Sequence, residues 1–172
     1  LSAWLLNSKL KGTKMLKTDL TGAVLSGADL RGADLSQAVL AYSQMSNVNL
    51  NNAILKKADL TEADLSDADL IDADLTDARL FRTDLSGANL KGIYLIGANL
   101  IGAHVSWADL SESYISKGQF SRAELYSADL HGADLSEADF TRAYLMNANL
   151  TRANLKSTSL SYADLTEAKL ME

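Results

Sequence analysis

Residues 58–75 read ADLTEADLSDADLIDADL, and this stretch contains an internal repeat with a period of five residues. Every residue from Leu5 to Leu170 whose number is divisible by five is apolar, and 28 of these 34 positions are Leu. The residue two positions earlier is Ala in 24 of the 34 units, and the register never slips. The repeat therefore predicts a single domain over residues 1–172.

A period of five suits neither an α-helix nor a β-strand. In a helix, five residues advance by about 500°, so successive leucines would spiral around the axis. In a strand, an odd spacing sends alternate leucines to opposite faces. A chain that turns a corner every five residues points one leucine inward from each short side. Stacked coils of this kind, about 4.8 Å apart, would bury a leucine-filled core, so the period predicts an all-β solenoid.

The unit Ala-(Asp/Asn)-Leu-x-x, as at residues 58–60 and 148–150, resembles the repeat of the pentapeptide-repeat protein family, and the match covers essentially the whole chain. The resemblance implies a right-handed quadrilateral β-helix with four five-residue sides in each coil. The repeat units would then form about 8.5 coils in a rod roughly 41 Å long.

Two core residues favour coils with four sides. Phe120 and Phe140 are the only phenylalanines in the core column, and they are four repeat units apart, so a four-sided coil would stack them directly. Phe120 follows Gly118 where Ala is usual, and the missing methyl group would make room for the ring.

Composition excludes some classes of protein. There is no cysteine, so no disulfide or thiolate site can form. No apolar run approaches the about 18 residues of a membrane span. Because the first residue is Leu, we expect the chain to come from a longer protein. Residues 1–18 carry a charge of +4 and residues 19–172 carry 12 − 22 = −10. The basic end either serves solubility or docks on an acidic partner or adjoining domain.

A stack of coils exposes unpaired backbone groups at each end. Residues 1–10 contain Leu1, Trp4, Leu5 and Leu6, and we expect them to form an N-terminal cap. The chain is still in repeat register at its last residues. We therefore expect end-to-end self-association or a fused domain at the C-terminal end.

The outward Asp and Asn residues are predicted to be structural, as acceptors that bind backbone N–H groups at corners. One column alternates largely between the two residue types: Asp29, Asn49, Asp69, Asn89, Asp109, Asp129 and Asn149. The densest acidic stretch, residues 59–77, would go once round a square coil as a collar. Such carboxylates diverge, which disfavours a calcium site.

Catalysis has little support. The two histidines, His104 and His131, fall on different sides of successive coils, and no nucleophile–base pair or phosphate-binding glycine loop is visible. The glycines at 87, 92, 97 and 102 keep the repeat spacing and are predicted to be corner residues. We therefore expect a protein that is not an enzyme, with no cofactor and no metal.

One side of the rod has aromatic and other large side chains at outward positions that are mostly polar elsewhere, and this side is the candidate partner-binding surface. Its residues are of types enriched in binding hot spots, and they share one side only if each coil has four sides. These residues are His104, Trp107, Arg122, Tyr126, Arg142, Tyr144 and Met146. Both arginines are expected to flank the two tyrosines. The alternative is aromatic packing between coils that only stabilises the fold. A smaller cluster on the opposite side comprises Ile54, Tyr94, Ile96 and Tyr114.

These features predict a non-enzymatic rigid scaffold or interaction module that presents flat β faces to a partner protein, without direct nucleic-acid binding. The alternative, implied by the resemblance, is an acidic DNA mimic that acts on a DNA-binding enzyme such as DNA gyrase. Family members that confer quinolone resistance are understood to act in this way. They also carry loops that interrupt the coil, and this sequence has none.

Overall fold

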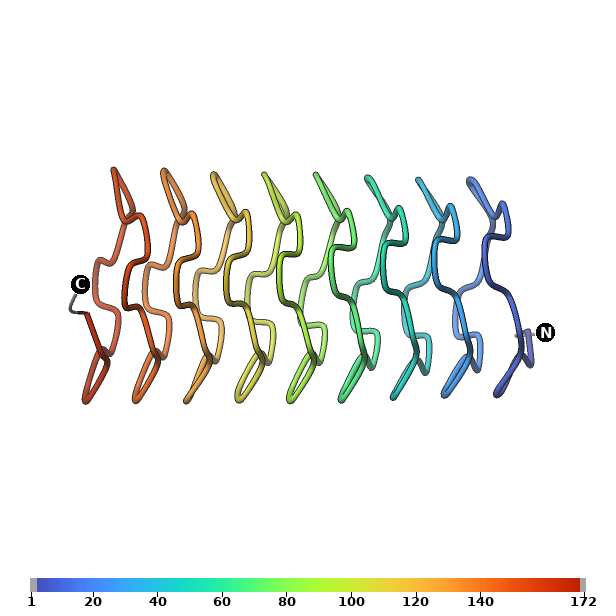
Figure 1. Cartoon of the computed structure of the whole chain (residues 1–172), viewed down its shortest axis with the longest axis horizontal. Coiled ribbons are helices and arrows are strands. Elements are labelled where there is room, and N and C mark those ends of the chain that lie inside the picture. Colours follow the sequence, from blue (N-terminus) through green and yellow to red (C-terminus); the bar gives the residue numbers. More distant parts are fainter. Residues whose placement is uncertain (1–2, 171–172) are drawn as a thin grey trace.

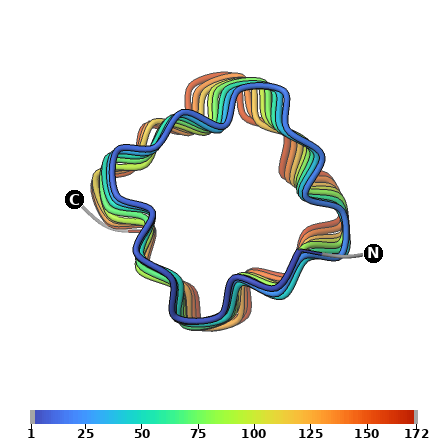
Figure 2. The same cartoon turned by 90° about the vertical axis from the view of Figure 1, so that its right-hand side faces the viewer.

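The chain folds into a rod of stacked, nearly identical coils (Figure 1). This computed structural model describes residues 3–170. Parallel β-bridges join each coil to the next along the described chain, from Trp4–Val24 to Asn149–Lys169. Each coil therefore has four five-residue sides, and the end view shows a four-cornered ring (Figure 2). The fold is the predicted right-handed quadrilateral β-helix.

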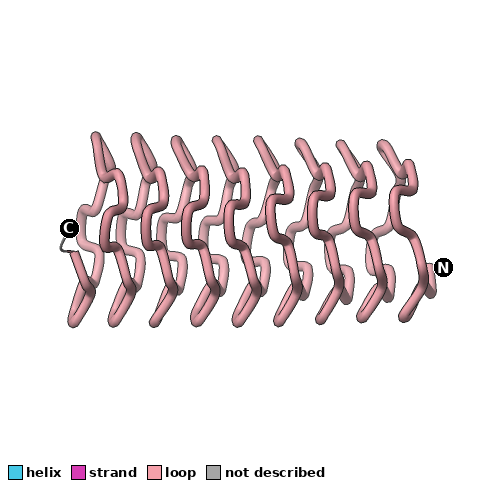
Figure 3. Tube along the Cα trace, in the orientation of Figure 1, coloured by secondary structure: helices cyan, strands magenta, loops and turns pink. Residues whose placement is uncertain are grey.

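The sides are too short to form conventional strands. Within residues 3–170 there is no helix, and each side contributes one bridging residue between two-residue turns, so the whole trace is drawn as loop (Figure 3). Hydrogen bonds nevertheless run regularly between coils. Asp64 N–H donates to Ser43 O at 2.9 Å in the preceding coil, and Leu65 N–H donates to Asp84 O at 2.7 Å in the following coil. This ladder satisfies the backbone without long strands.

Each corner is a tight turn whose third residue has a left-handed backbone. In one such turn Ala68 N–H donates to Leu65 O at 3.2 Å, and Asp67 between them has φ +55°. A positive φ at this position is typical of a type II turn, which favours Gly or Asn. The glycines at 87, 92, 97 and 102 have φ of 66–69°, which confirms their prediction as corner residues.

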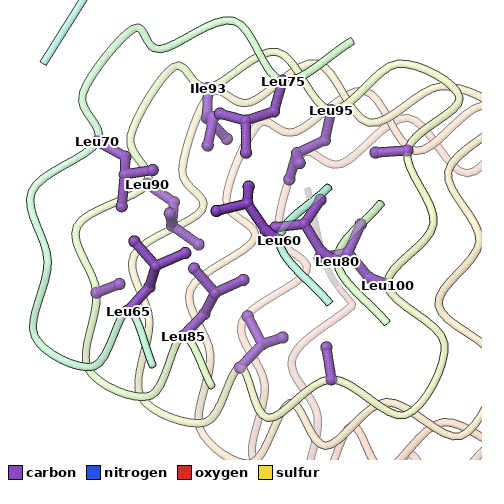
Figure 4. Close-up of a cluster of buried hydrophobic side chains, with 14 of the residues drawn as sticks. Leu60, Leu65, Leu70, Leu75, Leu80, Leu85, Leu90, Ile93, Leu95 and Leu100 are labelled. Carbon is purple, nitrogen blue, oxygen red and sulfur yellow. The ribbon is translucent and has the colours of Figure 1, made fainter. Parts of the chain in front are cut away.

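The core is the column of residues numbered by five. Away from the two ends these side chains are buried, and the leucines from Leu60 to Leu100 point into the interior of the coil (Figure 4). Ala two positions earlier is also buried because it starts the same inward-facing side. Core residues in the first and last coils, such as Leu10 and Leu160, are only partly buried.

The predicted phenylalanine stack is present. The rings of Phe120 and Phe140 lie 4.7 Å apart with an interplanar angle of 15°. A Cβ added to Gly118 would lie 2.9 Å from Phe120 Cε2 and 2.9 Å from Ile115 O. The missing methyl group at Gly118 therefore does make room for the Phe120 ring.

The first described residues already follow the coil. Trp4 bridges Val24 and Lys9 bridges Asp29, while the side chains of Trp4 and Leu6 are exposed. Residues 3–10 are thus part of the stack and not a separate element. Leu1 lies outside the described residues, and the role of this end as a cap stays a prediction.

Candidate functional site

The outward carboxylates and amides mostly serve the corners. Asp64 Oδ1 accepts from Ser66 N–H at 3.0 Å and from Ser66 Oγ at 2.6 Å, and the same contact recurs at corners along the chain. Asp109 and Asp129, adjacent in their column, accept from Ser111 N–H at 2.9 Å and His131 N–H at 3.0 Å. These bonds confirm that the outward Asp residues act as structural acceptors at corners.

The same bonds lower the pKa of several carboxyl groups. Hydrogen bonds from the Thr141 and Ser121 side chains and from Thr141 N–H lower the pKa of Asp139, against the opposing effect of burial. The side chain of Arg31 is the largest cause that lowers the pKa of Asp29 to about 2. These shifts arise from local hydrogen bonds and, at Asp29, from the Arg31 ion pair, so they do not indicate an active site.

The acidic stretch forms the predicted collar. Its acids at positions 62, 67, 72 and 77 occupy the four corners of one coil, each with a positive φ. Asp59 and Asp74 on two of the sides form ion pairs with Arg79 at 3.6 Å and Lys56 at 3.0 Å. Within residues 3–170, no group of three or more His, Asp or Glu side chains is placed to hold a metal ion.

The candidate residues of the partner-binding surface lie on one side of the rod. The bridges place His104, Glu124 and Tyr144 in one column. Trp107 N–H donates to Tyr126 O at 2.9 Å, so the corner that contains Trp107 lies directly beside Tyr126 in the next coil. Coils with four sides therefore place His104, Tyr126 and Tyr144 on one side of the rod with Trp107 at its corner, and the partner-binding role of these residues stays a prediction.

A pair of stacked tyrosines forms the centre of this surface. The rings of Tyr126 and Tyr144 lie 5.8 Å apart with an interplanar angle of 24°. Tyr126 is half-buried and Tyr144 is exposed. Partial burial, with a smaller contribution from the Glu124 carboxylate, raises the pKa of the Tyr126 hydroxyl. Ser127 N–H donates to Met146 O at 2.9 Å, which places half-buried Met146 next to the pair.

The surface has a polar edge and an exposed tryptophan. His104 Nδ1 and Glu124 Oε2 lie 3.0 Å apart on the outer face of the column. The side chain of Trp107 is 70% exposed, and its backbone has φ +60°. Within residues 3–170, Trp107 makes no aromatic stacking or cation–π contact.

The two arginines do not stack on the tyrosine pair in the described residues, and their expected pairing with a partner's carboxylate stays a prediction. The guanidinium carbon of Arg142 lies 5.8 Å from the ring centre of Tyr162, one coil further on, and in the described chain no cation–π contact joins Arg122 or Arg142 to Tyr126 or Tyr144. Both arginines are exposed corner residues with φ +60°. Because residues one complete coil apart occupy the same corner, Arg142 stacks along its own column and does not reach across the face.

Sequence reasoning missed Tyr162, which is 85% exposed. It follows Arg142 by one complete coil, and this spacing was the signal that could have identified it. The smaller cluster on the opposite side is also real: Tyr94 and Tyr114 stack with their ring centres 4.7 Å apart, and Ile54 lies exposed in the same column.

Four-sided coils, a leucine core and left-handed corners define the class as a β-solenoid built from five-residue units. The family model described as "Pentapeptide repeats" matches this chain in eight copies, over residues 5–40, 43–80, 78–116, 106–142 and 133–172. The chain therefore belongs to the pentapeptide-repeat family. This match indicates no catalytic family.

Two solved structures illustrate the likeness. HetL, a pentapeptide repeat protein involved in heterocyst differentiation regulation in the cyanobacterium Nostoc sp. strain PCC 7120, is 33% identical, with 96% of this chain and 88% of HetL covered and a TM-score of 0.49. A trypsin-treated form of QnrB1, a plasmid-mediated fluoroquinolone resistance protein, is 22% identical, with 99% and 90% covered and a TM-score of 0.56. The likeness to QnrB1 concerns the fold alone. A search of curated proteins gave no match.

In residues 3–170 no helix has the length and apolar character that crossing a membrane requires.

Proposed function

We propose that this chain is a non-enzymatic interaction module that binds a partner protein through the aromatic face, defined as Trp107, Tyr126, Tyr144 and Met146 with the flanking His104. The proposal is carried by one observation: the corner of exposed Trp107 is hydrogen-bonded through its backbone to Tyr126, which stacks on Tyr144, so three consecutive coils present aromatic side chains on one side of the rod. Aromatic residues on a rigid support lose little conformational entropy on binding, which suits an anchor.

The position of Trp107 argues against a purely structural role. A left-handed backbone costs a bulky residue roughly 1 kcal/mol relative to glycine. The tryptophan also leaves most of its apolar surface in water, since it is 70% exposed. The tyrosine pair gains stability from stacking, whereas Trp107 gains no such contact within the described chain. A partner that covers Trp107 would offset this cost.

An acidic DNA mimic is the weaker candidate. A mimic needs charge that runs lengthwise, about one charge per 1.7 Å, as in the duplex. The densest acids of this chain go round the rod, and two of them are neutralised by Lys56 and Arg79. The repeating coils also continue without an interrupting loop through residues 3–170. These features favour an aromatic contact over electrostatic mimicry.

The test compares two aromatic corner residues. The immobilised rod captures proteins from an extract of its source cells, and captured proteins are identified and quantified for the wild type, Trp107→Gly and Tyr42→Gly. Tyr42 is the matched control, because it is 58% exposed and has φ +61° but lies four coils before Arg122 in the corner column of the arginines, far from the tyrosine pair.

We expect Trp107→Gly to weaken retention of one partner by at least about 30-fold, equivalent to about 2 kcal/mol. The double variant Tyr126→Ala/Tyr144→Ala should have a similar effect. Tyr42→Gly should retain the partner, and the melting temperature of Trp107→Gly should not fall. Equal retention by Trp107→Gly and the wild type would contradict the proposal. Capture that disappears steeply with salt would favour the mimic instead.

A further inference from the structure

Three arginines lie in a single corner column of an otherwise acidic rod. Arg82, Arg122 and Arg142 occupy equivalent third positions of turns, with φ of 53–60°, and all three are exposed. The stacked rings elsewhere show that coils are 4.7 Å apart. Arg122 and Arg142 are therefore one coil apart, and Arg82 is two coils from Arg122, with Gly102 between them. These three residues are named the arginine ridge, and they share one corner of the four-sided coil because they are whole coils apart.

The carboxylates on the side that follows this corner form hydrogen bonds or ion pairs with residues other than the three arginines. Asp84 Oδ1 accepts from Ser86 N–H at 2.9 Å, and Glu124 pairs with His104. Asp164 accepts from the backbone N–H and the side chain of Thr166. None of these three groups therefore neutralises the ridge.

The remaining neighbouring carboxylates also leave the ridge unpaired. On the side that precedes the corner, Asp139 accepts from the Ser121 side chain and from Thr141 N–H. Glu62 occupies the same corner column one coil before Arg82, but it forms no ion pair with that arginine in the described chain. In residues 3–170, no salt bridge or side-chain hydrogen bond involves an arginine of the ridge.

Aromatic rings support two of the three guanidinium groups. The guanidinium carbon of Arg82 lies 5.0 Å from the ring centre of Phe81, and that of Arg142 lies 5.8 Å from the ring centre of Tyr162. Stacking uses the flat face of a guanidinium group and leaves its N–H donors free at the edge. Such donors are preorganised for two parallel bonds to a carboxylate.

We propose that the arginine ridge binds a short acidic segment of a partner protein, whose carboxylates pair with the three guanidinium groups. This inference rests on the proposed function and assigns the partner's chemistry: one edge of the aromatic face, at Arg122 and Arg142, receives negative charge. A short segment supplies a few carboxylates over the three coil spacings from Arg82 to Arg142. We expect the occupant to be a protein segment because the adjoining aromatic face is proposed to bind a protein, and the ridge ends after these three coil spacings.

The test measures binding of a fluorescein-labelled peptide of ten glutamates by fluorescence anisotropy at low salt. The ridge variant is Arg82→Asn/Arg122→Asn/Arg142→Asn, because Asn tolerates a left-handed backbone and retains the turn. The matched control is Arg152→Asn, since Arg152 is also an exposed corner arginine, with φ +60°, but belongs to a different column. An oligothymidylate of the same length is the competing probe. Circular dichroism and melting temperatures check the fold of each variant.

We expect the ridge variant to bind the glutamate peptide at least about tenfold more weakly than the wild type and the control to bind it normally. Equal loss in the control, no loss in the ridge variant, absence of peptide binding, or tighter binding of oligothymidylate would each overturn the inference. The partner-capture test with Trp107→Gly is independent of these outcomes. The proposal for the arginine ridge can therefore be refuted while the proposal for the aromatic face is supported.

Discussion

The contact between Gly118 and Phe120 makes a sharp test of how the core is packed. In the substitution Gly118→Ala, the new methyl group would meet Phe120 Cε2 and Ile115 O at 2.9 Å and Ile115 Cγ2 at 3.1 Å. The ring cannot move freely, because it stacks on Phe140 at 4.7 Å and is fully buried. Overpacking of this kind costs about 1–3 kcal/mol.

A second effect of Gly118→Ala has the opposite sign. Gly118 does not have a left-handed backbone, unlike the corner glycines, so alanine is compatible with its conformation. Loss of unfolded-state entropy at such a site stabilises a protein by about 0.4–1 kcal/mol. We therefore expect Gly118→Ala to lower the free energy of unfolding by about 0.5–2 kcal/mol in the wild-type background.

The assay is a double-mutant cycle with Phe120→Leu, measured by urea denaturation. The ordinary repeat has Leu in the core position and Ala two positions before it. In the Phe120→Leu background, Gly118→Ala restores this pair and should therefore be neutral or stabilising. A cycle with no coupling would refute the steric reasoning. Such a result would mean that the Phe120 ring shifts to a position like that of Phe140, which packs with Ala138 intact.

Three further predictions concern the core, the corners and buried hydroxyl groups. Leu95→Ala should cost about 2–5 kcal/mol in urea denaturation because Leu95 is fully buried, and a loss below about 0.5 kcal/mol would contradict the inward column. The melting temperature should fall between about pH 4 and pH 2. Asp29 and Asp139 have folded-state pKa values below the ordinary 3.8. Their contribution to stability is therefore present above pH 3.8 and is lost as the pH falls through the folded-state values. Asp29→Asn should make this fall shallower, and an unchanged pH profile would contradict the assignment. Ser113→Ala should be neutral or stabilising because its buried Oγ has no partner in the described chain, whereas Ser43→Ala should cost about 1 kcal/mol because Ser43 Oγ donates to Leu40 O at 2.7 Å; equal effects in thermal melts would argue against this difference.

The fold could be predicted almost completely because each unit imposes the same requirements. A leucine at every fifth position must point inward, and a preceding alanine leaves space for it, so the register is specified in every coil. The exception at Gly118 and Phe120 could also be predicted from the sequence, because the methyl group missing at Gly118 makes space for the larger ring of Phe120. The number of sides was the exception: the period does not give it, and it came from the family resemblance with support from the spacing of Phe120 and Phe140.

The candidate site was predicted only as a set of neighbouring positions. The four-sided coil placed Trp107, Tyr126 and Tyr144 on one side correctly, since the bridges fix which residues are adjacent. The direction of long side chains depends on local rotamers, which the repeat does not encode. Arg142 therefore stacks on Tyr162 in its own column, although the sequence suggested the tyrosine pair.

The regular repeat also indicates which of its positions can carry functional residues. Inward positions must be small or apolar, and outward Asp or Asn residues are largely used by the corners, so these positions have little freedom to vary. The third turn residue faces solvent and favours Gly or Asn, and any bulky residue there costs stability. Trp107 and the three arginines of the ridge all occupy this position, and they lie along two edges of the same side of the rod. A partner that contacts both edges would cover the tyrosine pair between them, which makes the aromatic face and the arginine ridge parts of one binding surface.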